Sequence, residues 1–393
     1  MTPAARVQAA IEILDGVIAA ARSGGAPADR IAAEWFRARR FAGSKDRRAI
    51  RELVWSAIRA CGDIPPSGRA AMLRLAEVDT AIAPLFDGSG YGPAPVAEGE
   101  GAASGGVAPA WLVDALAASG VDEAERAALL DRAPLDIRVN RLKADRDALA
   151  AELAHPAERL TAPDGLRFAA GTPVESWPQF DEGLFEVQDG GSQLACAALA
   201  AAPGEKVIDL CAGAGGKTLS LAASMENNGS LLACDIDRTR LSRLQPRAAR
   251  AGAIVETRLL DPGREPEMLA DWQGRADAVL VDAPCSGTGT WRRNPEARWR
   301  LSPKTLDRHV AAQRGVLDVA QALVAPGGRL TYIVCSLLDA EGTDQIAWFL
   351  DSHPGWKVLP SLLAAGRPHG PGTRLTPCHD GTDGFFFATL QRL

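Results

Sequence analysis

The chain has 393 residues, of which 47% are hydrophobic and 23% charged, and its net charge is −6 at pH 7. That length allows two or three domains with sizeable cores, and the charge disfavours a uniformly basic nucleic-acid binder. No stretch approaches the roughly 20 consecutive apolar residues of a membrane span, and the N-terminus, with Glu12 and Asp15, lacks the apolar core of a secretory signal. None of the seven cysteines forms a C-x-x-C pair. We therefore expect free thiols in the cytoplasm, no metal site, no membrane partner and a monomer.

Residues 1–85 have the periodicity of a helical domain. Apolar residues recur at helical spacing from Val7 to Ile18, a second run covers residues 31–41, and a third begins at Ser44, the expected N-cap. The first 69 residues carry 12 Lys/Arg against 7 Asp/Glu, a local excess that suits an anionic partner. The stretch GSKDRRAIRELVWSAIR, residues 43–59, resembles the NusB-like helical RNA-binding domain. A plain helical bundle with a solvated basic face accounts for the same pattern.

Two segments separate this domain from the rest of the chain. Residues 86–109 are rich in Gly, Pro, Ala and Ser and predict a flexible linker or a long exposed loop. Residues 110–184 predict a helix followed by a small α/β module, with strands at residues 135–142 and 165–168 around a helix at residues 145–153.

Residues 185–393 alternate between strand and helix patterns. Strands are expected at residues 206–210, 230–235, 254–260, 276–282, 329–335 and 385–390, with helices at residues 239–251, 306–323 and 344–353. This alternation predicts an α/β fold with a mostly parallel sheet and helices on both faces. Pro246 should kink or shorten the first of those helices.

The stretch DLCAGAGGKTL, residues 209–219, predicts a strand, a tight glycine-rich turn and a helix, the first unit of a nucleotide-binding domain. It fails the P-loop pattern because Cys211 occupies the position of the first glycine. It fails the dinucleotide pattern because Thr218 replaces the third glycine. The loop therefore suits a ligand other than ATP or NAD.

Three of the predicted strands end in an acid, namely Asp235, Asp261 and Asp282. Ligands of open parallel sheets bind outside the carboxyl ends of the strands, where these carboxylates could accept hydrogen bonds from ribose hydroxyls, an adenine amino group and a substrate. Strand-end acids can also simply cap helices.

Two cysteines are predicted at the same edge of the sheet. Cys285 lies in the turn DAPCSGTG, and Cys335 ends the strand in LTYIVCSLL. A cysteine is more often a small buried apolar residue than a nucleophile, which is our interpretation of Cys61 and Cys196. Cys285 and Cys335 differ because both should project into the cleft that holds the acids.

The motifs DLCAGAGGKT, ACDID, LLDP, DAPCSGTG, YIVCS and DGFFFATL, in this order, resemble the RNA cytosine-5 methyltransferases of the Sun/Fmu (RsmB) type. The resemblance also includes LDIRVNRLKA and FEVQDGGSQLA. It implies a class I, Rossmann-like S-adenosylmethionine-dependent methyltransferase sheet, preceded by a small RNA-recognition-like module and often by a NusB-like domain. The expected domains are then 1–85, 86–109 (linker), 110–184 and 185–393 (catalytic).

The resemblance also implies the reaction and its residues. The product would be 5-methylcytosine in RNA. Small-subunit ribosomal RNA during its processing is the expected substrate, and transfer RNA is the alternative. Cys335 would be the nucleophile, Cys285 would assist product release, and Asp282 would bind the cytosine edge. The cofactor-binding residues would be Cys211, Ala212, Gly213, Ala214, Gly215, Gly216, Lys217, Asp235, Asp261 and Asp282.

Other interpretations stay open at this point. DNA cytosine-5 methyltransferases use the cysteine of a Pro-Cys pair, which would be Cys285, and a non-catalytic RNA-binding relative would keep the fold. The family's cofactor loop usually contains a proline that this chain lacks, so the loop should be more mobile. Residues 338–341 also depart from the family's Asn-Pro-Glu-Glu-like run after the nucleophile. Arginines and tryptophans between residues 291 and 300 suit an RNA strand, or else tryptophans that face a core.

Overall fold

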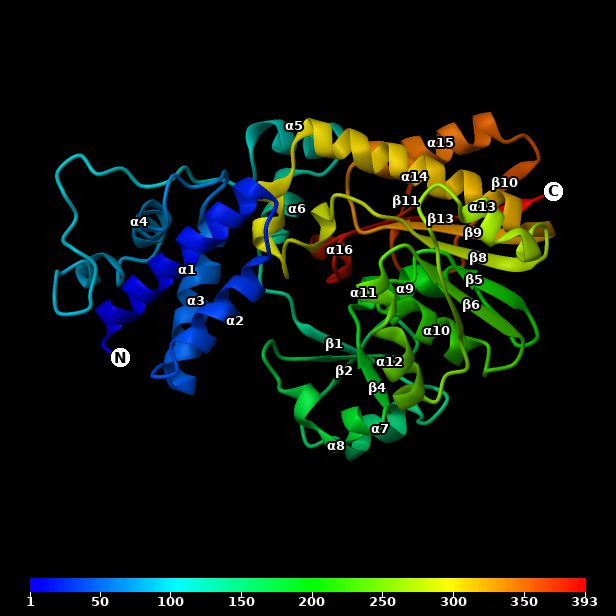
Figure 1. Cartoon of the computed structure of the whole chain (residues 1–393), viewed down its shortest axis with the longest axis horizontal. Coiled ribbons are helices and arrows are strands. Elements are labelled where there is room, and N and C mark those ends of the chain that lie inside the picture. Colours follow the sequence, from blue (N-terminus) through cyan, green and yellow to red (C-terminus); the bar gives the residue numbers. More distant parts are fainter. The chain divides into compact units, whose positions relative to one another are not determined.

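The computed structural model describes all 393 residues (Figure 1). Their contacts form two compact units: Met1–Asp131 with Thr290–Ser302, and Arg132–Gly289 with Pro303–Leu393. The finer division into the domains 1–85, 110–184 and 185–393 remains a proposal. No helix combines the length and the hydropathy that a membrane crossing requires.

The first unit is helical, as predicted. Its helices are α1 (Pro3–Ser23), α2 (Ala28–Ala38), α3 (Ser44–Ala60), α4 (Gly68–Val78), α5 (Ala110–Ala118) and α6 (Glu123–Ala128), with a short 3-10 turn, η1 (Ala83–Leu85). Helix α1 begins where the Thr2 side chain accepts a hydrogen bond from the Ala5 N–H, and it ends at Gly24 with φ 71°. The prediction that Ser44 is an N-cap was wrong by one residue. Gly43 is the cap of α3 and contributes no side-chain hydrogen bond.

The segment of residues 86–109 contains neither helix nor strand. The Arg69 guanidinium contacts it at three points, donating to the carbonyls of Ala94 and Pro95 and pairing with the Glu100 carboxylate. Farther along, the Ala103 N–H donates to the Ala70 carbonyl of α4 at 3.0 Å. The flexibility of this linker remains a prediction.

The sequence left open whether the Arg/Trp-rich segment contacts RNA or turns its tryptophans toward a core, and the structure places much of the segment inside the helical unit. The segment forms a 3-10 helix, η5 (Pro295–Arg300), and Trp299 joins the core of α1 to α4. Arg298 is fully buried and donates to the carbonyls of Ile58 and Cys61 at 2.7 and 2.8 Å. Burial lowers the pKa of Arg298 to about 10. Trp291 is also buried. These side chains fold the protein and do not present a surface to RNA.

The second unit begins with the small α/β module. Its elements are β1 (Leu135–Val139), α7 (Arg146–Glu152), β2 (Glu158–Arg159), β3 (Gly165–Phe168), η2 (Val174–Ser176), α8 (Pro178–Asp181) and β4 (Phe185–Val187). The strands form an antiparallel sheet in the order β2-β3-β1-β4. This βαββαβ connectivity and strand order is that of the ferredoxin-like fold, to which RNA-recognition modules belong.

Both faces of the module's sheet are covered. Ile137 and Val139 of β1 point to the module's own apolar core, which includes Leu149 of α7. The alternate residues Asp136 and Arg138 point to the other face and are only 1% and 4% exposed. RNA-recognition modules bind bases on an open sheet face, so this sheet lacks the surface that such binding needs.

The large sheet has the strand order β11-β12-β13-β9-β8-β5-β6-β7, with β10 paired to β13. Its strands are β5 (Lys206–Asp209), β6 (Ser230–Asp235), β7 (Glu256–Leu259), β8 (Ala276–Asp282), β9 (Val324–Val334), β10 (Trp356–Leu359), β11 (Arg367–His369), β12 (Gly372–Leu375) and β13 (Phe385–Arg392). Strands β5 to β9 pair in parallel and β13 is antiparallel. The chain runs from β5 outward to β7 and then returns to β8, so the strand order reverses beside β5. Ligands of such sheets bind at this point of reversal.

Alternate residues of the central strands fill two cores, one on each face of the sheet. Ile208 of β5 and Val279 of β8 pack under α14 (Pro303–Leu323) and α15 (Thr343–Ser352). Val207 and Leu280, their neighbours along the strands, pack against α9 (Gly190–Ala197) and α10 (Gly216–Ser224). The predicted three-layer α/β architecture is confirmed.

The differences from the expected elements have local causes. The helix predicted over residues 239–251 is divided into α11 (Arg238–Leu241) and α12 (Leu244–Ala251), and Pro246 lies in the first turn of α12, where its missing N–H costs no hydrogen bond. The short strands β2, β10, β11 and β12 were not predicted because they are too short for a clear alternation. The remaining short helical elements are α13 (Glu265–Met268), η3 (Ala270–Trp272), η4 (Thr288–Thr290), η6 (Asp339–Glu341) and α16 (Pro377–Asp380).

Candidate active site

The glycine-rich loop connects β5 to α10 at the point where the strand order reverses. Gly213 and Gly215 have φ angles of 55° and 89°, a region that side chains with a Cβ rarely adopt. The loop closes through Thr218, whose hydroxyl donates to the Asp209 carboxylate at 2.6 Å. Burial raises the pKa of Asp209 to about 7, although the Thr218 hydrogen bond opposes that shift. One Asp209 oxygen, Oδ1, is buried without a hydrogen-bond partner.

Arginines of the two following helices hold this loop from outside. Arg247 of α12 donates to the Ala214 carbonyl at 2.6 Å and to the Glu186 carboxylate of β4 at 2.8 Å. Arg240 of α11 lies against Gly213, so closely that a Cβ there would collide with its guanidinium. The loop was predicted to be more mobile without the family's proline, and these contacts restrain it in another way.

The acids at the strand ends differ in their surroundings. Asp235 at the end of β6 is buried, and its two oxygens accept the N–H groups of Gly213 and Asp237, each at 2.7 Å. Asp235 therefore lies directly against the glycine-rich loop. Asp261 follows β7 by two residues, its side chain is 61% exposed, and its carboxylate lies 3.9 Å from Arg264. The structure gives Asp261 no contact with the other predicted site residues.

Lys217, at the start of α10, and Asp282, at the end of β8, form an ion pair. The Lys217 Nζ donates to Asp282 Oδ2 at 2.7 Å, with the lysine side chain 10% and the aspartate side chain 30% exposed. Burial disfavours the ammonium, but the Asp282 charge and hydrogen bond outweigh it and raise the pKa of Lys217. A predicted cofactor residue and a predicted catalytic residue thus touch each other directly.

The two cysteines predicted to share a cleft are brought together. Their Sγ atoms lie 3.4 Å apart, and each side chain is partly exposed. The hydrogen bond to Cys335 is the largest of the effects that raise the pKa of Cys285 well above its usual range, followed by burial, the charge of Cys335 and the Glu341 carboxylate. Cys61 and Cys196, interpreted as core residues, are buried as expected.

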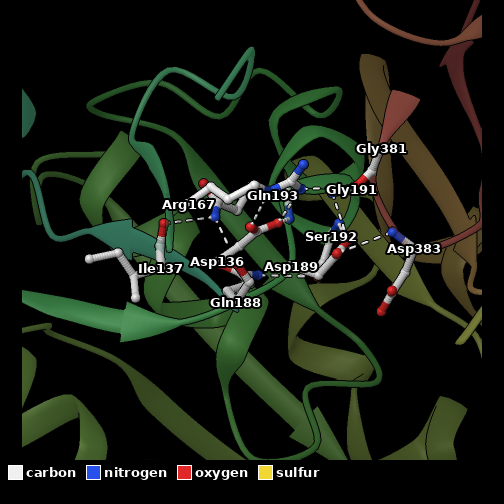
Figure 2. A network of polar contacts seen from close by, with 11 residues as sticks. Asp136, Ile137, Arg167, Gln188, Asp189, Gly191, Ser192, Gln193, Gly381 and Asp383 are labelled. Carbon is white, nitrogen blue, oxygen red and sulfur yellow. Dashed lines mark hydrogen bonds and ion pairs between the residues drawn. The ribbon is translucent and has the colours of Figure 1, made fainter. Parts of the chain in front are cut away.

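A polar network fixes the N-terminus of α9 between the module and the turn before β13 (Figure 2). Asp136 accepts two hydrogen bonds from Arg167, at 2.7 and 2.8 Å, and one from the Gly190 N–H at 3.0 Å. Asp189 caps α9, and its other oxygen accepts the Asp383 N–H at 3.1 Å. The motif FEVQDGGSQLA therefore positions the turn that precedes β13.

That turn reaches the cysteine pair through two glycines. The Gly384 N–H donates to the Gly289 carbonyl at 2.8 Å, and the Gly289 N–H donates to the Cys335 carbonyl at 3.0 Å. A Cβ on Gly289 would collide with the Gly384 backbone, so the close approach requires glycine at residue 289.

Three supporting residues escaped the sequence analysis. Asp209 ends β5 exactly as Asp235 and Asp282 end their strands, so the strand-end pattern could have identified it. Arg247 and Glu341 gave no such signal, because their roles depend on contacts between segments far apart in the chain.

Comparison with known proteins agrees with this geometry. Residues 196–391 match the family described as 16S rRNA methyltransferase RsmB/F. The chain is 36% identical over 266 residues to the ribosomal RNA small subunit methyltransferase B of Enterobacter sp. (strain 638), covering 66% of this chain and 60% of that protein. The chain belongs to the RsmB/F methyltransferase family.

Solved structures extend the likeness beyond the matched region. The crystal structure of PH0851 superposes with a TM-score of 0.78 at 26% identity, covering 100% of this chain and 99% of that one. A methyltransferase homologue from Pyrococcus horikoshii gives a TM-score of 0.60 at 27% identity, over 72% of this chain and 99% of that one. The prediction of a Rossmann-like methyltransferase fold in the Sun/Fmu family is confirmed. The chain spans 60% of the length of the Enterobacter protein.

Proposed function

We propose that the chain is an S-adenosylmethionine-dependent enzyme that forms 5-methylcytosine in RNA through a covalent cysteine–cytosine adduct. The observation that carries this proposal is the pair of thiols 3.4 Å apart, beside the Lys217–Asp282 pair, at the edge where such sheets bind ligands. A binding protein without chemistry has no need of two partly exposed thiols in contact.

The residues around the glycine-rich loop fit S-adenosylmethionine. The unpartnered Asp209 oxygen offers an acceptor beside a cofactor that carries both an ammonium and a sulfonium. The space next to Gly216 is open, so no side chain would meet a ligand there. We propose that residues 211–217 hold the methionine part, Asp235 the ribose and Asp261 the adenine. When bound, this cofactor supplies an electrophilic methyl group.

The chain's own residues would carry the remaining steps. Carbon 5 of cytosine is a poor nucleophile, so we propose that the Cys335 thiolate first forms a bond to carbon 6 and moves an electron pair to carbon 5. Asp282 would accept a hydrogen bond from the cytosine edge, with Lys217 fixing its orientation. After carbon 5 is methylated, Cys285 would remove its proton, and the carbon 6–sulfur bond would break to restore the double bond.

Ribosomal RNA is the proposed substrate because relatives of this chain are named ribosomal RNA small subunit methyltransferase B. Bisulfite sequencing of ribosomal and transfer RNA from a deletion strain tests this. We expect one cytosine of small-subunit ribosomal RNA to lose its protection from bisulfite in the deletion strain. If a transfer RNA cytosine loses protection instead and the ribosomal pattern is unchanged, transfer RNA is the substrate. We further propose that the enzyme acts in the cytoplasm as a monomer.

The helical unit is the proposed second contact to RNA. Phe41 is 71% exposed between α2 and α3, and exposed cations flank it at Arg37, Arg40, Lys45 and Arg48. None of these four cations forms an ion pair in the structure. An exposed ring among unpaired cations suits base stacking with phosphate contacts.

The adduct itself is testable on a denaturing gel. Wild type, Cys285→Ala and Cys335→Ala are incubated with S-adenosylmethionine and total RNA. We expect only Cys285→Ala to accumulate a slow-migrating band that nuclease removes. Trapping by Cys335→Ala would reverse the two roles, as in DNA cytosine-5 methyltransferases. No trapping and no methyl transfer by wild type would leave a non-catalytic RNA-binding protein.

A further inference from the structure

Glu341 is a fully buried carboxylate beneath the two cysteine loops. It belongs to η6, six residues after Cys335, yet its hydrogen bonds go to the loop of Cys285. The Ser286 N–H donates to Glu341 Oε1 at 2.8 Å, and the Ser286 hydroxyl donates to Oε2. Because both carboxylate oxygens accept hydrogen bonds from the residue next to Cys285, the negative charge of Glu341 is held on the Cys285 side of the thiol pair.

The same network joins the two loops to each other. The Ser286 and Ser336 hydroxyls, each adjacent to a cysteine, lie 3.2 Å apart, and the Thr288 hydroxyl lies 3.0 Å from that of Ser336. Gln313 of α14 donates to both the Pro284 carbonyl and Glu341 Oε1, at 2.9 and 3.1 Å. The side chains of Ser286, Thr288, Gln313, Ser336 and Glu341 are all buried, and a buried, connected hydrogen-bond network holds one geometry. It therefore sets the distance between the two thiols.

A negative charge lies beside one of the two thiols. The Glu341 carboxylate is bound to the residue next to Cys285 and is one of the groups that raise the pKa of the Cys285 thiol. The other titratable group that faces Cys285 is Tyr332 of β9, a buried phenol whose hydroxyl donates to the Glu341 carbonyl at 2.7 Å.

We propose that Glu341 is a positioning residue that joins the two cysteine loops, sets the contact between the two thiols and holds a negative charge beside Cys285. This role rests on the proposed function and deepens it. A thiol adds to an electron-poor ring only as thiolate, and a carboxylate beside Cys285 disfavours a second thiolate next to the attacking one. Cys285 must then lose its own proton before it can accept the proton of carbon 5.

Alkylation by iodoacetamide tests the proposal without RNA or cofactor, so its outcome is independent of whether the chain methylates RNA. The full chain carries Cys335→Ser, and peptide mass spectrometry follows the modification of Cys285 from pH 6 to pH 11. Adding Glu341→Gln should shift the Cys285 profile to lower pH by about one unit, because a nearby negative charge is removed. Adding Glu341→Asp should keep the original profile even if the chain becomes less stable.

Asp339→Asn is the matched control, because it removes a charge from the same 3-10 turn. The Asp339 carboxylate pairs with Arg374 and His369, away from the cysteines, so the Cys285 profile should not move. Superimposable profiles for Glu341→Gln and the parent, with equal melting temperatures, would overturn the proposal.

If Glu341→Gln fails to fold, Ser286→Ala gives the decisive measurement. In the Cys335→Ser chain, Ser286→Ala removes the hydroxyl that donates to Glu341 Oε2 and should also shift the Cys285 profile to lower pH, since the carboxylate is then held less firmly beside Cys285. An unchanged Cys285 profile would show that Glu341 does not position Cys285.

Discussion

The Lys217 ammonium and the Asp282 carboxylate meet at 2.7 Å, and the lysine is the more deeply buried partner. Lys217 belongs to the first turn of α10 and Asp282 to the last residue of β8, so the contact joins the glycine-rich loop to the loop of Cys285. The pair therefore links the proposed cofactor site to the proposed cytosine-binding site through a single hydrogen bond.

We predict unequal costs for removing the two partners. Asp282→Ala leaves a buried ammonium unpaired and should lower the free energy of unfolding by about 3 kcal/mol. Lys217→Ala leaves a half-buried carboxylate that water can reach, and should cost about 1 kcal/mol. Urea unfolding of both variants and of the double variant measures this. A double variant that costs the sum of the two would show that the pair carries no interaction energy.

Arg247 should control cofactor affinity through the loop that it holds. Arg247→Met removes the hydrogen bonds to Ala214 and Glu186. The glycine-rich loop is then more mobile in the free protein and must be ordered when the cofactor binds. We expect S-adenosylmethionine to bind about tenfold more weakly, which corresponds to about 1.4 kcal/mol. Isothermal titration calorimetry gives the dissociation constant. Arg243→Met, an exposed arginine one turn earlier, is the control and should bind like wild type.

Arg298 should matter for stability because its guanidinium satisfies buried carbonyls of the helical unit. Arg298→Met would remove the shorter hydrogen bonds to the Ile58 and Cys61 carbonyls and leave each with a weaker donor at 3.3 Å, at a cost of about 3 kcal/mol in the free energy of unfolding. Arg37→Met, on the exposed face of α2, should leave the melting temperature unchanged. Equal melting temperatures for the two variants would contradict the assigned role of Arg298.

The exposed cations near Phe41 should instead affect RNA binding. Arg37→Met together with Arg40→Met removes two proposed phosphate contacts, so the salt dependence of RNA affinity, log K against log[salt], should become shallower by between one and two. Filter binding at several salt concentrations measures the slope. An unchanged slope would remove the helical unit from the RNA interface.

The sequence predicted what depends on periodicity and on strand ends. Strands β6 and β8 have the predicted bounds, and Cys285 and Cys335 meet because both follow neighbouring parallel strands. The sequence did not predict whether a charged residue is buried or exposed, because this depends on contacts with segments that are distant in the chain. Arg298 carries the same side chain as an RNA-binding arginine, and its burial depends on carbonyls at the end of α3 and just beyond it, which are far away in the sequence.

The same limit applies to the supporting residues of the site. Residues 338–341 looked like a departure from the family pattern, yet Glu341 supplies the carboxylate that joins the cysteine loops. Its role depends on Ser286, 55 residues earlier in the chain, and no local pattern reports that contact.

Asp209 makes the stability of the catalytic unit depend on pH. Its pKa is about 7 in the folded chain, because of burial, and near 4 in an unfolded one. Between these values the folded state binds a proton that the unfolded state lacks, so the free energy of unfolding contributed by Asp209 falls as pH rises from about 4 to about 7 and stays low above that. Asp209→Asn keeps an acceptor for Thr218 without the charge. Relative to wild type, it should gain stability over this range, by on the order of 3 kcal/mol.

Urea unfolding of wild type and Asp209→Asn at pH 5, 6, 7 and 8 provides the comparison. The difference between their free energies of unfolding should grow up to about pH 7 and then level off. Thr218→Val removes the hydrogen bond that favours the ionised form of Asp209. The free energy of unfolding of this variant should therefore keep falling to a higher pH than that of wild type. Parallel curves for wild type and Asp209→Asn at every pH would mean that the Asp209 carboxylate is ionised in the folded chain throughout, with its charge compensated by Lys217.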